Sequence, residues 1–274
     1  METVDMRVLM IYRAERYSPN SVVKDRQILD AVGHELRECG AEVLFMCEES
    51  LTDYADADVI FSMGRCPDTI EWLARKEEEG VRVINSSRGM RSSRRSFVDR
   101  MMRENAIPAA PQYGNCGYWL KRGDGAAQQK EDVVFAVDEA ERDRRLEDFM
   151  SRGIRDVVTT AHVRGDLVKF YGVAGTPFFR CYYPTDDGGS KFGDECRNGK
   201  AMHYDFSRSL LMENATRLAG LLGLEVYGGD CIVRQDGTFA IIDFNDWPSF
   251  SRCRNDAAKA IASLACAGTK ESHL

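Results

Sequence analysis

The chain has 274 residues, 43% of them hydrophobic and 30% charged, and a formal net charge of −7. This length suits about two domains, and the composition excludes collagen-like, low-complexity and wholly disordered chains. The acidic balance argues against general nucleic-acid binding. The 37 basic residues comprise 28 arginines and 9 lysines, an excess that reflects either genome composition or local pockets for phosphate or carboxylate, which arginine binds well.

The first 90 residues alternate short apolar runs with helical patterns. One helix is expected after Ser18-Pro19, ending at Gly40, and another over 67–79, with proline at its first turn and Gly80 at its end. The apolar runs predict strands over 6–11, 42–47, 57–63 and 81–85. This alternation predicts a parallel, doubly wound α/β sheet, and the lack of GxGxxG after the first strand excludes a dinucleotide fingerprint.

The stretch 86–105 is rich in arginine. It carries Arg88, Arg91, Arg94, Arg95, Arg100 and Arg103. A helix is predicted over 93–105, because Phe97, Val98, Met101 and Met102 share one face. Two interpretations stay open for the arginines: a solvated helix face, or an anion-binding wall at a domain junction. The two prolines of 106–113 then predict an extended connector.

The rest of the chain has an α+β pattern. Strands are predicted over 117–122, 133–137, 157–163, 166–175, 178–183, 225–234 and 238–244, and helices over 138–152, 207–222 and after Asn255. The polar stretch 184–205 is long enough to be either a functional or a disordered loop. Cys196 and His203 lie in this stretch, and we expect no nucleophilic role for either because no positioned base is readable nearby.

The two strands around Asp236-Gly237 form the strongest local signal. An Asp-Gly pair between apolar runs predicts a hairpin, and taking these two as the turn residues places Asp230 opposite Asp243. Asn245 follows two residues later and shares their face. Two opposed carboxylates repel, so they call for a cation, and two carboxylates with one amide oxygen suit Mg²⁺, with Mn²⁺ as a substitute. The alternative is a chance alignment of a turn aspartate with an asparagine cap.

The hairpin and its surroundings resemble those of a known protein family. The segment GGDCIVRQDGTFAIIDFNDWP closely resembles the C-terminal metal-binding hairpin of the ATP-grasp superfamily, and VDRMMRENAIPAAPQY resembles its entry into the central domain, with Arg100 where lysine is common. The resemblance implies a Rossmann-like pre-grasp domain over 1–92, then an ATP-grasp fold of two α+β subdomains. The first of these comprises a linker helix and the central ATP-binding subdomain over 93–176, and the second is the C-terminal subdomain over 177–274.

The resemblance also implies site residues, with ATP held between two antiparallel sheets. Lys121 and Lys169 are expected at the phosphates, and Arg180, with Lys169, at the transferred phosphoryl group. The loop with Gly123, Gly125 and Ala126 is expected over the phosphates, although its glutamine-rich form departs from the family. The expected hinge at adenine comprises Thr160, Ala161, His162 and Val163, without the usual acidic residue. Three arginines are candidates for an anionic acceptor, namely Arg88, Arg252 and Arg254.

The favoured function is Mg-ATP-dependent phosphoryl transfer. By resemblance this is a ligase that activates a small carboxylate as an acyl phosphate for attack by an amine. The alternative is a kinase acting on a hydroxyl of an anionic substrate, since LVKFYGVAG and FFR are similar to inositol-phosphate kinases and the arginines of 88–103 suit a phosphorylated acceptor. A non-catalytic nucleotide-binding protein is a third hypothesis, which the intact Asp230, Asp243 and Asn245 oppose.

The cysteines and the apolar runs indicate in which cellular compartment the protein is expected. Nine cysteines without a CxxC pair predict free thiols in a reducing cytoplasm rather than a disulfide framework. No stretch reaches the roughly 18 apolar residues that span a bilayer, and the first residues lack a signal-peptide pattern. We therefore expect a cytoplasmic enzyme with a small anionic substrate and neither a nucleic-acid nor a membrane partner; a homodimer stays open.

Overall fold

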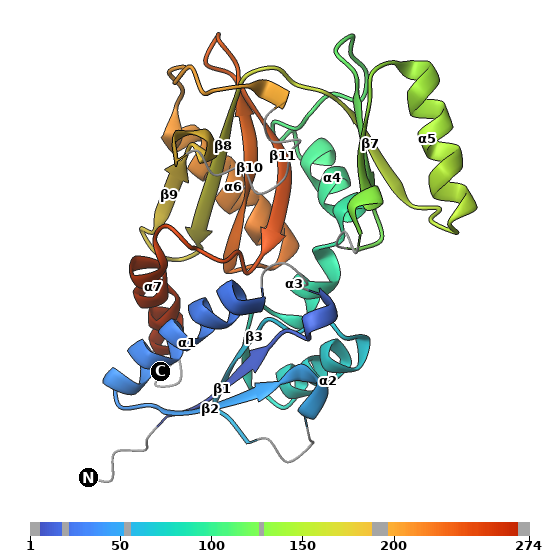
Figure 1. Cartoon of the computed structure of the whole chain (residues 1–274). Coiled ribbons are helices and arrows are strands. Elements are labelled where there is room, and N and C mark those ends of the chain that lie inside the picture. Colours follow the sequence, from blue (N-terminus) through green and yellow to red (C-terminus); the bar gives the residue numbers. More distant parts are fainter. Residues whose placement is uncertain (1–5, 18–21, 52–55, 126–128, 188–196, 268–274) are drawn as a thin grey trace.

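Three β-sheets organise the chain (Figure 1). The computed structural model describes residues 6–17, 22–51, 56–125, 129–187 and 197–267. The first sheet is parallel with strand order β2-β1-β3-β4, comprising β1 (Arg7–Tyr12), β2 (Glu42–Cys47), β3 (Val59–Ser62) and β4 (Arg82–Ile84). The helices between these strands are α1 (Val22–Glu38) and α2 (Pro67–Glu78). The predicted doubly wound α/β pattern is confirmed; Ser18-Pro19 lie outside the described residues.

Strands β1, β3 and β4 are buried on both faces, which explains their continuous apolar runs, whereas the edge strand β2 leaves Leu44 exposed. On one face α1 contributes Ile28, Leu29 and Val32, and on the other α2 contributes Trp72 and Leu73. The last helix, α7 (Arg254–Ala267), packs beside α1 and buries its apolar side in the same core. The end of the chain thus returns to the N-terminal sheet.

A second, three-stranded antiparallel sheet has the order β6-β5-β7. It comprises β5 (Tyr118–Arg122), β6 (Val133–Ala136) and β7 (Val157–Ala161). Its outer face is covered by α5 (Glu139–Ser151), where Tyr118, Leu120 and Phe149 form a small core. Because side chains alternate along a strand, Trp119 and Lys121 face the other way.

The third sheet is antiparallel with the order β11-β10-β8-β9. It comprises β8 (Asp166–Val173), β9 (Phe179–Tyr182), β10 (Val226–Val233) and β11 (Phe239–Asp246). Helix α6 (Arg208–Leu222) covers one face, on which Phe170 and Phe244 pack against its leucines. The opposite face is turned toward the three-stranded sheet, with helix α4 (Arg95–Glu104) alongside (Figure 1).

The structure differs from the predicted elements at two places. The helix predicted over 93–105 is confirmed as α4, but a short helix that was not predicted, α3 (Ser87–Ser92), precedes it, and the extended backbone at Arg94 separates the two. Strand β8, which the predicted division at residue 176 places in the central subdomain, pairs with β9 and β10 and so lies in the sheet of the C-terminal part. The division between the two antiparallel sheets therefore falls within 162–165. The predicted limit at residue 92 stays a prediction.

Short 3-10 turns complete the described structure. They span Glu15–Tyr17, Glu48–Ser50, Lys130–Asp132 and Pro184–Asp187. Within the predicted loop 184–205, residues 188–196 lie outside the described part, and Asp166 holds the part near Met202 and Tyr204 by accepting both backbone N–H groups at 2.7 and 2.8 Å. Among the described helices, none combines the length and apolar character needed to cross a membrane. The seven cysteines whose state the structure describes are free thiols.

Candidate functional site

The hairpin of β10 and β11 places Asp230 directly opposite Asp243, as predicted. The assumed two-residue turn is wrong, however. The turn has three residues, 235–237, closed by a hydrogen bond from the Arg234 N–H to the Thr238 carbonyl at 2.8 Å, with Gly237 at φ 80°. A β-bulge at Ile242 then adds one residue and restores the expected pairing beyond it.

Four polar side chains from three neighbouring strands meet on one face of this sheet. Lys169 of β8 is in register with Asp230, and its Nζ lies 3.2 and 3.3 Å from the two carboxylate oxygens of Asp230. Asn245 donates from Nδ2 to Oδ2 of Asp243 at 3.0 Å. The side chains of Asp230 and Asp243 are 24% and 27% exposed, so both carboxylates are accessible to a ligand.

Lys121 reaches this face from the three-stranded sheet. Its Nζ donates to the Ile242 carbonyl at 2.8 Å, the carbonyl of the bulged residue. Burial lowers the pKa of Lys121, while Asp243 and Asp230 act to raise it. Burial by itself raises the pKa of Asp243, but Lys121, Arg95 and the Asn245 amide together hold it below its ordinary value. Lys121 thus joins the two sheets across the site.

Arg95, at the start of α4, is a site residue that the sequence did not single out. Its Nε lies 3.8 Å from Oδ1 of Asp243, and its Nη1 donates to the Arg122 carbonyl at 2.7 Å. Six arginines lie within 88–103, and no spacing signal distinguishes this one, because its contact with Asp243 depends on the packing of α4 against β11.

The donor set fits a hard cation beside phosphates. In the parts of the chain that the structure describes, no three His, Cys, Asp or Glu side chains gather as metal ligands. The two opposed carboxylates and the Asn245 amide instead suit Mg²⁺, which keeps waters and shares phosphate oxygens. Three cationic side chains (Lys121, Lys169 and Arg95) surround these two carboxylates. That surplus positive charge favours a polyanionic ligand.

Of the predicted hinge residues, His162 lines a cavity of about 480 Å³, whose other lining residues include Phe135, Arg164, Asp166, Arg197 and Met202. The Trp119 indole N–H donates to Nδ1 of His162 at 3.1 Å, and burial lowers the pKa of His162.

The other hinge residues point in different directions. Thr160 lines a smaller pocket with Lys121 and Asp243. Val163 belongs to an apolar cluster with Leu167 and Ile232, against which Ile242 packs. The side chain of Ala161 packs toward α5 instead.

The predicted phosphate loop is only partly described. The Gly123 N–H donates to the Asp156 carbonyl at 2.8 Å, and its carbonyl accepts from the Ser96 N–H at 3.1 Å. This anchors the loop's first residue to α4 and to the residue that precedes β7. Gly125 is partly exposed, and Ala126 lies outside the described residues.

The four arginines expected at a phosphoryl group or acceptor have other partners in the structure. Arg180 shares the site's sheet face by register, but its Nη2 lies 3.6 Å from Oδ2 of Asp256. Arg88 donates to the Leu221 carbonyl at 3.2 Å, near the end of α6. Arg252 donates to the Tyr183 carbonyl at 3.1 Å, and Arg254 donates to Oε1 of Gln27 at 2.7 Å. Their roles toward a substrate stay predictions.

No protein-family model and no curated protein matches the sequence. Solved structures match the fold over nearly its whole length. D-alanyl-alanine synthetase A from Vibrio cholerae O1 biovar eltor is 9% identical and covers 96% of this chain and 98% of its own, with a TM-score of 0.67. The RimK domain protein ATP-grasp from Sphaerobacter thermophilus is 17% identical, with coverages of 95% and 99% and a TM-score of 0.63. The ATP-grasp ligase PsnB, complexed with a minimal precursor, is 15% identical, with coverages of 96% and 99% and a TM-score of 0.59.

Proposed function

Because the chain has the ATP-grasp fold, we propose that it is an ADP-forming ligase that uses Mg-ATP to activate the carboxylate of a small anionic molecule as an acyl phosphate, which an amine then attacks. One observation carries the proposal. Lys121 of one antiparallel sheet meets Asp243 of the other, beside the Lys169–Asp230 pair and Asn245. Cations and hard oxygen ligands thus converge between the two antiparallel sheets, which supports a site for the triphosphate there.

Each group has a proposed role in this site. Lys121, Lys169 and Arg95 would offset phosphate charge, while Asp230, Asp243 and Asn245 would hold Mg²⁺. A bound Mg²⁺ bridges phosphate oxygens and neutralises charge that develops on them. The apolar cluster around Val163 and the cavity at His162 would take the nucleobase.

The proposed reaction has two steps, a phosphoryl transfer to the carboxylate and an acyl transfer to the amine. A carboxylate oxygen attacks the γ-phosphorus, the bond to the β-phosphate oxygen breaks, and ADP leaves. The amine nitrogen then attacks the acyl carbon, inorganic phosphate leaves, and the nitrogen loses a proton. The neighbour PsnB is complexed with a precursor and another neighbour is named for D-alanyl-alanine synthesis; both names are compatible with a carboxylate acceptor. Arg180, on the site's sheet face, is proposed for the transferred phosphoryl group.

The proposal is tested in two stages. Thermal unfolding with ATP, with and without Mg²⁺, tests nucleotide binding, since a ligand at 100 times its Kd stabilises the native state by about 2.7 kcal/mol. ADP release is then screened against a panel of small carboxylates, each with and without amines, and products are identified by mass. We expect release only with both co-substrates, together with an amide product. An unmoved Tm at millimolar Mg-ATP refutes nucleotide use, and a stable phosphate ester formed without any amine refutes the ligase.

A further inference from the structure

A buried ionic cluster lies at the end of β11, next to the candidate metal ligands. Asp246 follows Asn245 directly, and its side chain is 2% exposed. Its carboxylate binds two arginines from loops of the N-terminal parallel sheet. Arg65 pairs with Oδ1, and Arg13 lies 3.6 Å from Oδ2. These arginines follow β3 and β1, so the cluster joins the carboxyl edge of the parallel sheet to the strand that carries Asp243.

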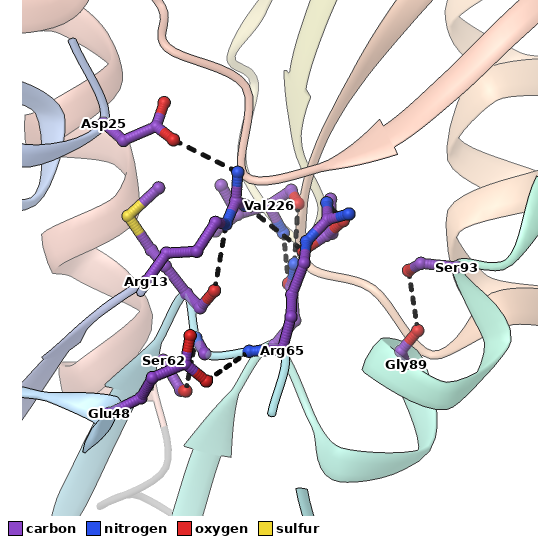
Figure 2. Close-up of polar contacts among 12 residues, drawn as sticks. Arg13, Asp25, Glu48, Ser62, Arg65, Gly89, Ser93 and Val226 are labelled. Carbon is purple, nitrogen blue, oxygen red and sulfur yellow. Dashed lines mark hydrogen bonds and ion pairs between the residues drawn. The ribbon is translucent and has the colours of Figure 1, made fainter. Parts of the chain in front are cut away.

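Both arginines are themselves held in place, as Figure 2 shows. Arg13 donates from Nη1 to Asp25 of α1 at 3.1 Å and from Nε to the Met63 carbonyl at 3.1 Å. The backbone that carries Arg65 is fixed by Glu48, a buried carboxylate that accepts from the N–H groups of Arg65 and Cys66, both at 2.7 Å. The same carboxylate accepts from the Ala14 N–H at 2.6 Å. A single side chain thus fixes both arginine-bearing loops.

The next residue anchors the same strand end by packing. Trp247 is 1% exposed and meets Phe61 of β3 edge-on, with ring centroids 6.4 Å apart. Its backbone is left-handed, with φ 43°, a conformation that costs a bulky residue energy and persists only where the surroundings fix it. Its N–H donates to the Val226 carbonyl at 3.2 Å. Asp246 and Trp247 together therefore fasten the end of β11 to the N-terminal sheet.

From this arrangement we infer that Arg65, Arg13 and Asp246 form a clamp that positions Asn245 and Asp243 for the metal and nucleotide; the inference rests on the proposed function. A buried ion pair contributes little net stability, because desolvation offsets its attraction, but it fixes geometry. A strand advances about 3.4 Å per residue, so a shift at Asp246 reaches Asn245 directly and Asp243 within about 10 Å. In this proposal the three clamp residues are positioning residues, which would act on the ligands only through Asn245 and Asp243.

The test uses the full-length protein and compares two buried aspartates that each bind two arginines. The clamp variants are Asp246→Asn, Arg65→Ala and the conservative Arg65→Lys. The matched control is Asp132→Asn, because Asp132 is 0% exposed and lies 3.0 Å from Arg152 and 3.9 Å from Arg122. For each protein, the Tm is measured without ligand and then at saturating ATP across a Mg²⁺ titration, which gives the Mg²⁺ concentration at half-maximal stabilisation.

Groups that orient metal ligands typically change metal affinity 10- to 100-fold. We therefore expect Asp246→Asn and Arg65→Ala to raise the half-maximal Mg²⁺ concentration by about 10-fold, with Arg65→Lys in between. Asp132→Asn should lower the ligand-free Tm and leave that concentration unchanged. The clamp is overturned if unmodified protein binds Mg-ATP and the clamp variants have the same half-maximal Mg²⁺ concentration as it does. If Asp246→Asn and Arg65→Ala do not fold, the same result in Arg65→Lys overturns it. Unmodified protein that shows no stabilisation by Mg-ATP refutes the proposed function itself.

Discussion

Replacing Asp243 by asparagine separates the metal role of this site from its phosphate role. In the folded protein, Asp230 and Asp243 face three cationic side chains, Lys121, Lys169 and Arg95. The substitution keeps the size of the side chain and the partner Asn245 but removes one of the two carboxylates. Mg²⁺ then loses half of its charged protein ligands, while the attraction of the site for phosphate is not reduced.

The expected magnitude follows from these contacts. We expect Mg-ATP-dependent turnover to fall by at least about 100-fold, which corresponds to about 2.7 kcal/mol of lost transition-state stabilisation. The fold should persist. The groups that lose a charged partner are the Arg95 guanidinium at 3.8 Å and the amine of Lys121, and the side chain of Arg95 is 18% exposed. A loss of about 1–2 kcal/mol in the free energy of unfolding is therefore expected.

The assay measures ADP release across a Mg²⁺ titration and, separately, ADP binding by calorimetry in a chelator. Asp243→Asn should lose the Mg²⁺-dependent ADP release and retain the binding of ADP in the chelator. The control is Asp236→Asn, the same chemical change in the turn of the same hairpin, where the side chain accepts from the Thr238 N–H at 3.0 Å. It should leave turnover unaltered. If Asp243→Asn turns over like the unmodified protein at every Mg²⁺ concentration, the metal assignment is wrong.

Three further predictions concern single side chains. Lys121→Met should weaken metal-free ADP binding by about 10-fold or more, measured by calorimetry, because the amine at the Ile242 carbonyl is lost; unaltered affinity would place the phosphates elsewhere. Gly229→Ala should weaken Mg-ATP binding and lower the Tm, because an added Cβ would lie 2.2 Å from the Asp243 carbonyl. The control Gly220→Ala has open space around the added Cβ and should raise the Tm. Equal changes of Tm and of Mg-ATP affinity in the two variants would contradict the predicted clash. Burial raises the pKa of Glu225 to about 7, partly offset by Arg82, so the protonated form is favoured in the folded state and stability declines as the pH rises from 4.5 through 7. Glu225→Gln should remove this decline, which is at most about 3 kcal/mol in denaturant unfolding between pH 5 and pH 8; an identical pH dependence in both proteins would show that Glu225 is not its source.

Local patterns predicted the parts of the fold that local physics controls. The alternation of apolar runs and capped helices predicted the parallel sheet, because burial on both faces demands such runs. The hairpin motif predicted the pairing of Asp230 with Asp243 and the ATP-grasp fold. The turn length was wrong and the pairing still right, since the three-residue turn and the bulge at Ile242 shift the register in opposite directions. A bulge leaves no clear mark in the residue pattern.

The sequence by itself determined the chemistry available at the site: two aspartates and an asparagine on one face of a hairpin, and lysines on other strands. Only the tertiary structure decided which cations complete it, because the Lys121–Ile242 contact and the approach of Arg95 to Asp243 join segments more than 100 residues apart. It likewise placed Asp246 between Arg65 and Arg13, and α7 on α1. Periodicity records which face of an element is buried, but not which partner buries it, and these contacts depend on that choice of partner.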